Sequence, residues 1–449
     1  MDTIFATATA PVKSGVAIIR ISGEKAGSAL ASLTRKQPPP PRLASLSRIF
    51  NPDTNELIDE ALILCFKAPA SFTGEDVAEL HVHGGRAVVT EVLQVLSEMP
   101  GLRMAEPGEF SRRAFENGKM DLTEAEGLAD LIDAETKIQA KMALRQKQGE
   151  LGRLYEEWRE ALLTILANIE AYIDFPDEEI PPHITAQIED DVEKLKTSFA
   201  KHLNDNKRGE RLREGLSVAI IGPPNAGKSS LLNLLARRDV AIVSEHAGTT
   251  RDIIEVHLDL GGYPIVIADT AGIRESAGEI EAEGIRRALA RAKDADFKII
   301  VFDAEDYSEE KLSQVLGDDF HSLIKQDSIV ILNKIDLLQN VNFIPQVAGI
   351  TTTEASFNNG VGIDKILLQI KKFAEDNFNI GGDPVITRQR HRSLLQEALT
   401  SLELFSLSKP IELAAEDLRH TANSLGKITG RIDVEEILGK IFSSFCIGK

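Results

Sequence analysis

The stretch GPPNAGKS at residues 222–229 most constrains what this chain can fold into. It follows an apolar run of strand length, LSVAII, and precedes a helix-like run, SSLLNLLARR. Gly222 and Gly227 allow the backbone N–H groups to curl toward phosphate oxygens, and the next helix adds its dipole. Lys228 can neutralise the outer phosphates, and Ser229 offers a hydroxyl to Mg²⁺. A plain turn needs neither side chain, so the stretch predicts a phosphate-binding loop in an α/β domain.

Three later motifs indicate which nucleotide the loop binds. GTTRD (248–252) offers a threonine to Mg²⁺, and DTAG (269–272) follows the strand-like YPIVIA. NKID (333–336) follows the strand-like SIVIL, and its Asp336 carboxylate can accept from both N1–H and the 2-amino group of guanine. Adenine does not offer that pair of donors. The four motifs in this order resemble the GTPase domain family and favour GTP over ATP.

One position departs from Ras-like GTPases, which carry a water-orienting glutamine after DTAG. Here Ile273 stands at that position and cannot form a hydrogen bond. The side-chain oxygen of Asn225, inside the phosphate loop, is a candidate ligand for a monovalent cation near the phosphates. Carboxylates in RESAGEIEAEG (274–284) can orient the water, although each of them taken alone is more simply a solvated acid.

Composition places the chain among ordinary globular proteins. It has 449 residues, 43% of them apolar, a formal net charge of −19 and two cysteines. Such a charge repels nucleic acid overall, so an RNA contact requires a local basic patch. Two distant cysteines favour a reducing compartment, and neither a signal peptide nor an apolar run of bilayer length is evident. We therefore expect a cytoplasmic protein without a membrane anchor.

The pattern along the chain predicts several domains. Strand-like runs at 15–22, 60–67 and 77–84, with a helix at 87–99, indicate an N-terminal α+β domain. Long runs at helical spacing follow, ending in a charged linker at 206–215, and alternating strands and helices come next. Because helices flank the α/β region, we expect it to be inserted into a helical domain. The predicted domains are 1–118 (α+β), 119–214 (helical, first part), 215–375 (GTPase) and 376–449 (helical, second part).

A more specific resemblance runs the full length of the chain. PNAGKSSLLN, AGTTRD, DTAGIRE and the terminal GKIFSSFCIGK resemble the MnmE (TrmE) family of bacterial tRNA modification GTPases. The same holds for SGVAIIRISG (14–23), SFTGEDVAELHVHGG (71–85), PGEFSRRAF with GKMDLTEAEGLADLIDA (107–134) and IDFPDEEI (173–180).

The resemblance implies a fold and a function. The fold is multidomain, α+β and α/β, with an N-terminal α+β folate-binding-like and dimerisation domain, a helical domain and an inserted Ras-like P-loop G domain. The function is GTP hydrolysis in a homodimer that joins an FAD-dependent MnmG-type partner in a heterotetramer. This complex modifies C5 of the tRNA wobble uridine with a carboxymethylaminomethyl or aminomethyl group. The implied one-carbon source is 5-formyl-tetrahydrofolate or a related folate.

The resemblance also assigns site residues. The expected catalytic residues are Glu281, which orients water, and Cys446, a thiol beside the folate-contacting Lys449. Folate contacts fall on Arg20, Glu79, Lys119 and Lys449. Mg²⁺ ligands fall on Ser229 and Thr250, and K⁺ ligands on Asn225, Ser244, His246 and Thr249. GTP contacts fall on Asn225, Ala226, Gly227, Lys228, Ser229, Ser230, Ser244, Thr249, Thr250, Asp269, Thr270, Ala271, Gly272, Asn333, Lys334 and Asp336.

Several simpler interpretations stay open. Glu79, His81 and His83 alternate on one strand and so share a face, a pattern that a metal site also shows. The arginines and lysine at 207–213 and 388–392 form either a tRNA-binding patch or a solvated helix entry. Cys65 is expected to be core packing, and burial is the plain alternative for Cys446. The alternative function is a regulatory GTPase of ribosome assembly, although the acidic helical tail does not resemble an RNA-binding domain.

Overall fold

The structure is a computed structural model. It describes residues 2–174, 181–238, 240–242, 255–269, 292–306, 327–338, 346–347, 350–378, 381–432, 435–443 and 445–448. The chain divides into two compact units, each made of segments that are distant in sequence. Unit 1 contains residues 1–129, 146–178 and 406–449, and unit 2 contains 130–145 and 179–405. The boundaries of the four predicted domains stay a prediction.

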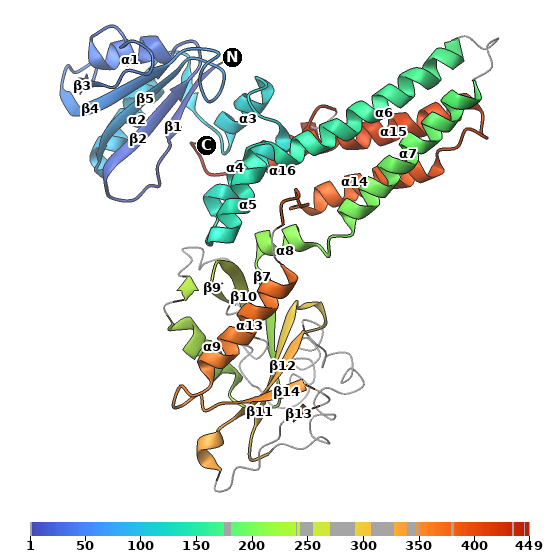
Figure 1. Ribbon diagram of the computed structural model, residues 1–449. Helices are drawn as coiled ribbons and strands as arrows, with labels where there is room; N and C mark the ends of the chain where they lie inside the picture. Colours follow the sequence, from blue (N-terminus) through green and yellow to red (C-terminus); the bar gives the residue numbers. More distant parts are fainter. Residues whose placement is uncertain are drawn as a thin grey trace, which may run out of the picture. The chain divides into compact units, whose positions relative to one another are not determined.

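Unit 1 is built around a six-stranded sheet of order β3-β4-β5-β2-β1-β6 (Figure 1). Alternate residues of its central strands, such as Ile19, Ile21 and Leu80, pack with α1 and α2 in one core. The predicted strands and the helix near 87–99 are confirmed within a few residues. The bounds are β1 Thr3–Thr7, β2 Ser14–Ser22, α1 Ala26–Thr34, β3 Ser45–Phe50, β4 Leu57–Phe66, β5 Val77–Gly84, α2 Arg86–Glu98 and β6 Leu102–Met104.

The helices of unit 1 come from both sides of the phosphate-loop motif in the sequence. Helix α6 packs against α15, with an ion pair of 3.0 Å between Glu170 and Arg419. Helix α16 packs against α3, where Phe115 and Phe442 lie with their ring centroids 6.5 Å apart. The bounds are α3 Glu109–Glu116, α4 Leu122–Asp133, α6 Glu150–Asp174, α15 Ile411–Thr429 and α16 Glu435–Ser443.

Unit 2 is built around a sheet of eight described strands in the order β13-β14-β12-β11-β7-β10-β9-β8. The five central strands from β14 to β10 are parallel, as predicted, whereas β8, β9 and β13 add antiparallel edges. Val218 and Ile220 of β7 enter one core with α9 and α13, while Ala219 and Ile221 enter another core. A parallel sheet buried on both faces explains these continuous apolar runs. The bounds are β7 Leu216–Ile221, α9 Lys228–Ala236, β8 Ala241–Ile242, β9 Glu255–Leu260, β10 Tyr263–Asp269, β11 Phe297–Asp303, β12 Ser328–Asn333, β13 Gln346–Val347, β14 Ile350–Glu354 and α13 Ile363–Asn377.

Four more helices complete the described part of unit 2: α5 Lys137–Lys147, which reaches its boundary, α7 Pro182–Leu203, α8 Arg208–Glu214 and α14 Gln389–Leu404. Helices α7 and α14, before and after the sheet in sequence, pack together. With the α6–α15 pair, this confirms that the α/β domain is inserted between helices. The charged linker expected at 206–215 is wrong, because α8 occupies most of it and Leu212 is fully buried.

Candidate GTPase and folate sites

The phosphate loop joins β7 to α9 with a backbone that two glycines make possible. Gly222 has φ 149°, and a side chain there would collide with the backbone of Val301 on β11. Gly227 has φ 104°, and a side chain there would meet the amide of Asn333. Both positions therefore require glycine for their conformation and for close approach. The Lys228 Nζ donates to the carbonyl oxygens of Gly222 (3.0 Å) and Pro223 (2.8 Å), both within the loop.

Asn225 lies at the outer turn of this loop. Its φ of 61° is in the left-handed region, which asparagine tolerates better than most residues. Asn225, Ser229 and Ser230 are exposed, whereas Ala226 is buried. Ser229 and Ser230 belong to the first turn of α9, where the backbone N–H groups and the helix dipole favour an anion. The loop therefore offers hydroxyls, an amide and backbone donors on one exposed surface.

Asn333 of the NKID motif ties three loops together. It is 3% exposed at the end of β12, and its Nδ2 donates to the Ala226 oxygen at 2.8 Å. Its Oδ1 accepts from the Phe357 N–H at 3.1 Å. The same side chain thus joins the phosphate loop to the loop after β14. Asp336 is exposed on a short 3₁₀ turn, Ile335–Leu337, next to Asn333, where a guanine edge is expected.

Two partners of this motif were missed by the sequence analysis. Lys334 has φ 66°, and its Nζ pairs with Asp303 Oδ2 at 2.7 Å. Asp303 ends β11 opposite Asn333, at the carboxyl edge where ligands of such sheets bind. An acid directly after the buried run FKIIVF could have indicated this role. Phe357 has no such sign, because its contact is made through the backbone.

Several predicted residues lie outside the part of the chain whose side chains the structure describes. Asp269 ends β10 and pairs in register with Ile220 of β7, which sets its backbone beside the start of the phosphate loop. The predictions for the others stay predictions: Ser244, His246, Thr249, Thr250, Thr270, Ala271, Gly272, Glu281 and Lys449.

In unit 1 the structure brings together two of the predicted folate residues. Arg20 and Glu79 are register partners on β2 and β5, with Arg20 Nε 2.9 Å from Glu79 Oε1. The Arg20 guanidinium lies 5.5 Å from the ring centroid of Phe72 and 5.7 Å from that of Phe110. Lys119 is exposed, and its Nζ donates to the Pro69 oxygen at 2.9 Å. Arg20 is thus held by a carboxylate and two aromatic rings, while Lys119 touches the loop that carries Phe72.

Cys446 is exposed and free, whereas Cys65 is buried in the sheet core. Burial raises the pKa of the Cys65 thiol, which fits the expectation of a packing residue. The Cys446 oxygen accepts from the Gly108 N–H at 3.4 Å, and Ile447 forms a bridge with Pro107. Burial is therefore excluded for Cys446, which lies near the start of α3.

Two other interpretations concern a metal site on β5 and a basic patch in unit 2. Within the described ranges, no group of three or more His, Cys, Asp or Glu side chains can hold a metal. His83 instead pairs with Asp59 at 2.7 Å. Four arginines of the proposed tRNA patch form ion pairs with carboxylates of unit 2, and the binding of tRNA phosphates by this patch stays a prediction. These pairs are Arg211–Asp296, Arg213–Asp130, Arg388–Asp130 and Arg392 with both Asp205 and Glu210.

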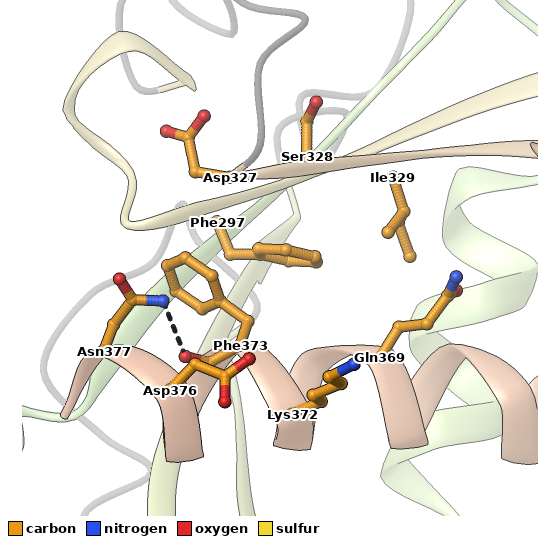
Figure 2. A pocket seen from close by; sticks show the side chains of 9 residues that line it. All are labelled: Phe297, Asp327, Ser328, Ile329, Gln369, Lys372, Phe373, Asp376 and Asn377. Atoms are coloured by element: carbon orange, nitrogen blue, oxygen red, sulfur yellow. Dashed lines mark hydrogen bonds between the residues drawn. The ribbon is translucent and has the colours of Figure 1, made fainter. Parts of the chain in front are cut away.

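A separate cavity of about 900 Å³ lies where β11 and β12 of the unit 2 sheet begin, away from the nucleotide motifs that follow their carboxyl ends. Figure 2 shows Phe297 and Phe373 facing each other between the starts of β11 and β12 and the end of α13. The nucleotide motifs follow the carboxyl ends of these strands, whereas Phe297 and Ser328 begin them. The cavity therefore contains none of the predicted site residues and is not the nucleotide site.

The inserted α/β fold, the phosphate loop at the end of β7 and the NKID loop define a P-loop GTPase. Comparison with protein-family models extends this assignment. The model for the MnmE helical domain matches residues 122–446, and the model for the N-terminus of the GTP-binding protein TrmE matches residues 3–119. The chain belongs to the MnmE family of tRNA modification GTPases.

Curated relatives match from end to end. The tRNA modification GTPase MnmE of Parvibaculum lavamentivorans is 51% identical over 453 residues, covering 100% of both chains. The protein of the same name from Rickettsia rickettsii is 50% identical over 450 residues, again with full coverage of both. Among solved structures, the G domain of the T. maritima FeoB iron transporter aligns with 35% of this chain and 98% of its own, at 26% identity and a TM-score of 0.28. Among the described helices, none is both long and apolar enough to cross a bilayer.

Proposed function

We propose that this GTPase is the GTP-hydrolysing subunit of a complex that modifies C5 of the tRNA wobble uridine. The carboxymethylaminomethyl or aminomethyl group draws its carbon from 5-formyl-tetrahydrofolate or a related folate, with an FAD-dependent MnmG-type protein as partner. One observation carries the proposal. The exposed Cys446 lies at the start of α3, the helix that presents Phe110 to Arg20, so a free thiol and the Arg20–Glu79 pair belong to one unit.

The residues around Arg20 fit the chemistry of a folate. Its pteridine ring offers N–H donors and a flat aromatic face, and its tail carries carboxylates. Glu79 is an acceptor, Phe72 and Phe110 are aromatic surfaces, and Arg20 and Lys119 are cations. The bound folate would supply a one-carbon unit, while these side chains orient it and exclude water. Lys449 is proposed to complete the folate contacts.

The nucleotide site fits Mg²⁺ and a monovalent cation. Ser229 offers its hydroxyl at the start of α9, where Mg²⁺ joins the outer phosphates, and Thr250 is the proposed second ligand. Asn225, exposed on the phosphate loop, offers a neutral oxygen to K⁺, with Ser244, His246 and Thr249 as proposed further ligands. Glu281 is proposed to orient the attacking water. If this is correct, Asn225→Ala makes GTP hydrolysis equally fast in K⁺ and Na⁺ buffers.

The open face of the unit 1 sheet supports the proposed homodimer. Leu46 and Leu62 are register partners on β3 and β4 and are 70% and 39% exposed. Leu62 is also the register partner of His81, near the sheet edge. Exposed apolar side chains that lie together on a sheet face favour association. We propose a homodimer through this domain, a heterotetramer with the MnmG-type partner, binding of tRNA by that assembly, and action in the cytoplasm.

The test is the nucleoside composition of tRNA from cells whose only copy carries Cys446→Ser. We expect the modified wobble uridine to disappear while GTP hydrolysis by the purified variant persists. Cys65→Ser, at a buried cysteine, is the matched control and is expected to keep the modification in any protein that folds. If Cys446→Ser leaves the modification intact, the thiol has no part in it. If deletion of the gene leaves tRNA unchanged and impairs ribosome assembly, the alternative regulatory function replaces this one.

A further inference from the structure

A network of charged side chains around the buried Arg113 in unit 1 has no role in the function proposed above. Arg113 of α3 is 4% exposed and Glu109 is 8% exposed. Arg113 donates to Glu109 Oε1 at 2.9 Å and to both carboxylate oxygens of Glu75 at 3.1 Å. Arg103 of β6 holds Glu109 with two further hydrogen bonds of 2.6 and 2.8 Å. We call these four residues, Glu75, Arg113, Glu109 and Arg103, the charge ladder.

The charge ladder contributes little net free energy to the stability of the fold. Burying charges costs free energy that pairing only just offsets, and well-packed apolar residues often stabilise a core as well or better. The pairing here is nevertheless effective. Burial alone would raise the pKa of the Glu109 carboxyl, but hydrogen bonds from Arg103, the Glu106 N–H and Arg113 hold that pKa below its usual value. A fixed, directional network of this kind sets the position of the segments that it joins.

One end of the charge ladder fixes the strap, residues 67–76 (KAPASFTGED). Glu75 accepts from the Ser22 hydroxyl at 2.6 Å, and that hydroxyl lies 2.7 Å from the Thr73 hydroxyl. Ser22 and Thr73 are fully buried. Phe72, whose ring lies against the Arg20 guanidinium, is next to Thr73 in this strap. The position of the Phe72 ring therefore depends on Glu75 and on the arginine that holds it.

The other end of the charge ladder fixes the turn that receives the tail, residues 445–448. Glu109 Oε2 accepts from the Glu106 N–H at 2.9 Å, which shapes the turn before α3. Pro107 of this turn bridges to Ile447, and the Gly108 N–H donates to the Cys446 oxygen. The tail also reaches the end of β1. A side chain on Gly448 would collide with Thr7, next to the Ala6 that pairs with Arg20.

We propose that the charge ladder is a positioning framework that joins the strap to the tail and so sets Cys446 relative to Arg20. Arg113 is the central member, because it contacts both carboxylates. This inference rests on the proposed folate function for its purpose, although the coupling between strap and tail does not. Arg113 and Glu75 are thus positioning residues that act through the strap and the tail.

Adjacent arginines on α3 provide the matched pair of variants. Arg113→Lys keeps the charge but cannot contact Glu75 and Glu109 with the same planar fork. Arg112→Lys alters an exposed arginine that pairs with Glu116 four residues along the same helix. Glu75→Gln removes one charge at nearly unchanged size and decides the question if Arg113→Lys does not fold. Each full-length variant is studied by hydrogen exchange in the free protein and by titration with 5-formyl-tetrahydrofolate.

In the free protein we expect Arg113→Lys and Glu75→Gln to accelerate amide exchange in both the strap and the tail by at least tenfold. Arg112→Lys is expected to leave both unchanged. In the titration we expect the folate Kd to rise at least tenfold, with GTP hydrolysis unaltered. Folate is also expected to protect Cys446 from alkylation in the wild type but not in Arg113→Lys, as scored by mass spectrometry separately from Cys65.

Hydrogen exchange tests the coupling of strap and tail, and the folate titration tests the proposed function. If amide exchange accelerates in the strap while the tail is unchanged, the charge ladder does not join the two segments and the inference is overturned. The inference is also overturned if exchange accelerates in neither segment. If the wild type binds no folate, the proposed function is wrong, yet the exchange arm still decides whether the segments are coupled. A general loss of stability would accelerate exchange across the whole sheet, so confinement to strap and tail is the outcome that supports a positioning role.

Discussion

At the scale of single residues, Asn333 is a predicted GTP contact that also holds two loops of the nucleotide site together. We expect Asn333→Ala to weaken GTP binding, because it leaves the Ala226 oxygen and the Phe357 N–H without their partner. An unsatisfied buried group costs about 1–3 kcal/mol, which corresponds to roughly a 5- to 150-fold rise in Kd. Titration with a fluorescent guanine nucleotide measures this change.

The control is Asn359→Ala in the loop after β14, where the side chain is exposed. Equal affinities of the two variants would show that Asn333 does not organise the loops. The motif located Asn333 correctly, but sequence could not supply its partners. Those partners depend on the register of β11, β12 and β14, which is set by packing on both faces of the sheet.

At the scale of elements, α5 shows how a helix outside the motif region completes the GTPase core. Met142 is 5% exposed within the same core as Leu260 and Tyr263. The Ile138 N–H donates to the Gly262 oxygen at 3.3 Å, at the turn between β9 and β10. Part of α5 therefore belongs to unit 2, although the segments on both sides of residues 130–145 belong to unit 1.

We expect Met142→Ala to lower the free energy of unfolding of unit 2 by about 2–5 kcal/mol, because it leaves a cavity in this core. Leu144→Ala on the same helix is the matched control, since Leu144 is 43% exposed. Its change is expected to stay within about 0.5 kcal/mol. Urea unfolding followed through guanine-nucleotide binding measures both variants. Equal midpoints would contradict the docking of α5 on this sheet.

The elements also show where sequence patterns were sufficient. Strands with continuous apolar runs, such as β7, β10, β11 and β12, were identified because burial on both faces leaves an unmistakable composition. The segment 206–215 was misjudged as a linker because its charges dominate. Two of those charged residues, Arg211 and Arg213, flank the buried Leu212 and pair with Asp296 and Asp130. Ion pairing to distant segments is not visible in a local pattern.

At the scale of the whole molecule, the chain has two compact units, each assembled from distant segments, and the sheet of each unit has an apolar core. The insertion was foreseeable from helices that flank an α/β pattern. The assignment of residues 130–145 to the second unit was not, because a helical spacing does not say which core a helix enters. Compact units that are built around two different sheets need not unfold together.

We therefore expect calorimetry of the full chain to show two unfolding transitions. GTP is expected to raise the midpoint temperature of only one of them. Nucleotide at 100 times its Kd stabilises the unit that binds it by about 2.7 kcal/mol, which corresponds to a shift of roughly 5–10 °C for a unit of this size. Lys228→Ala, in the phosphate loop, is expected to abolish this shift without moving the other transition. If the proposed function is correct, 5-formyl-tetrahydrofolate raises the midpoint temperature of the unit 1 transition alone. A single transition that both ligands move together would contradict this expectation and would mean that the two units unfold as one.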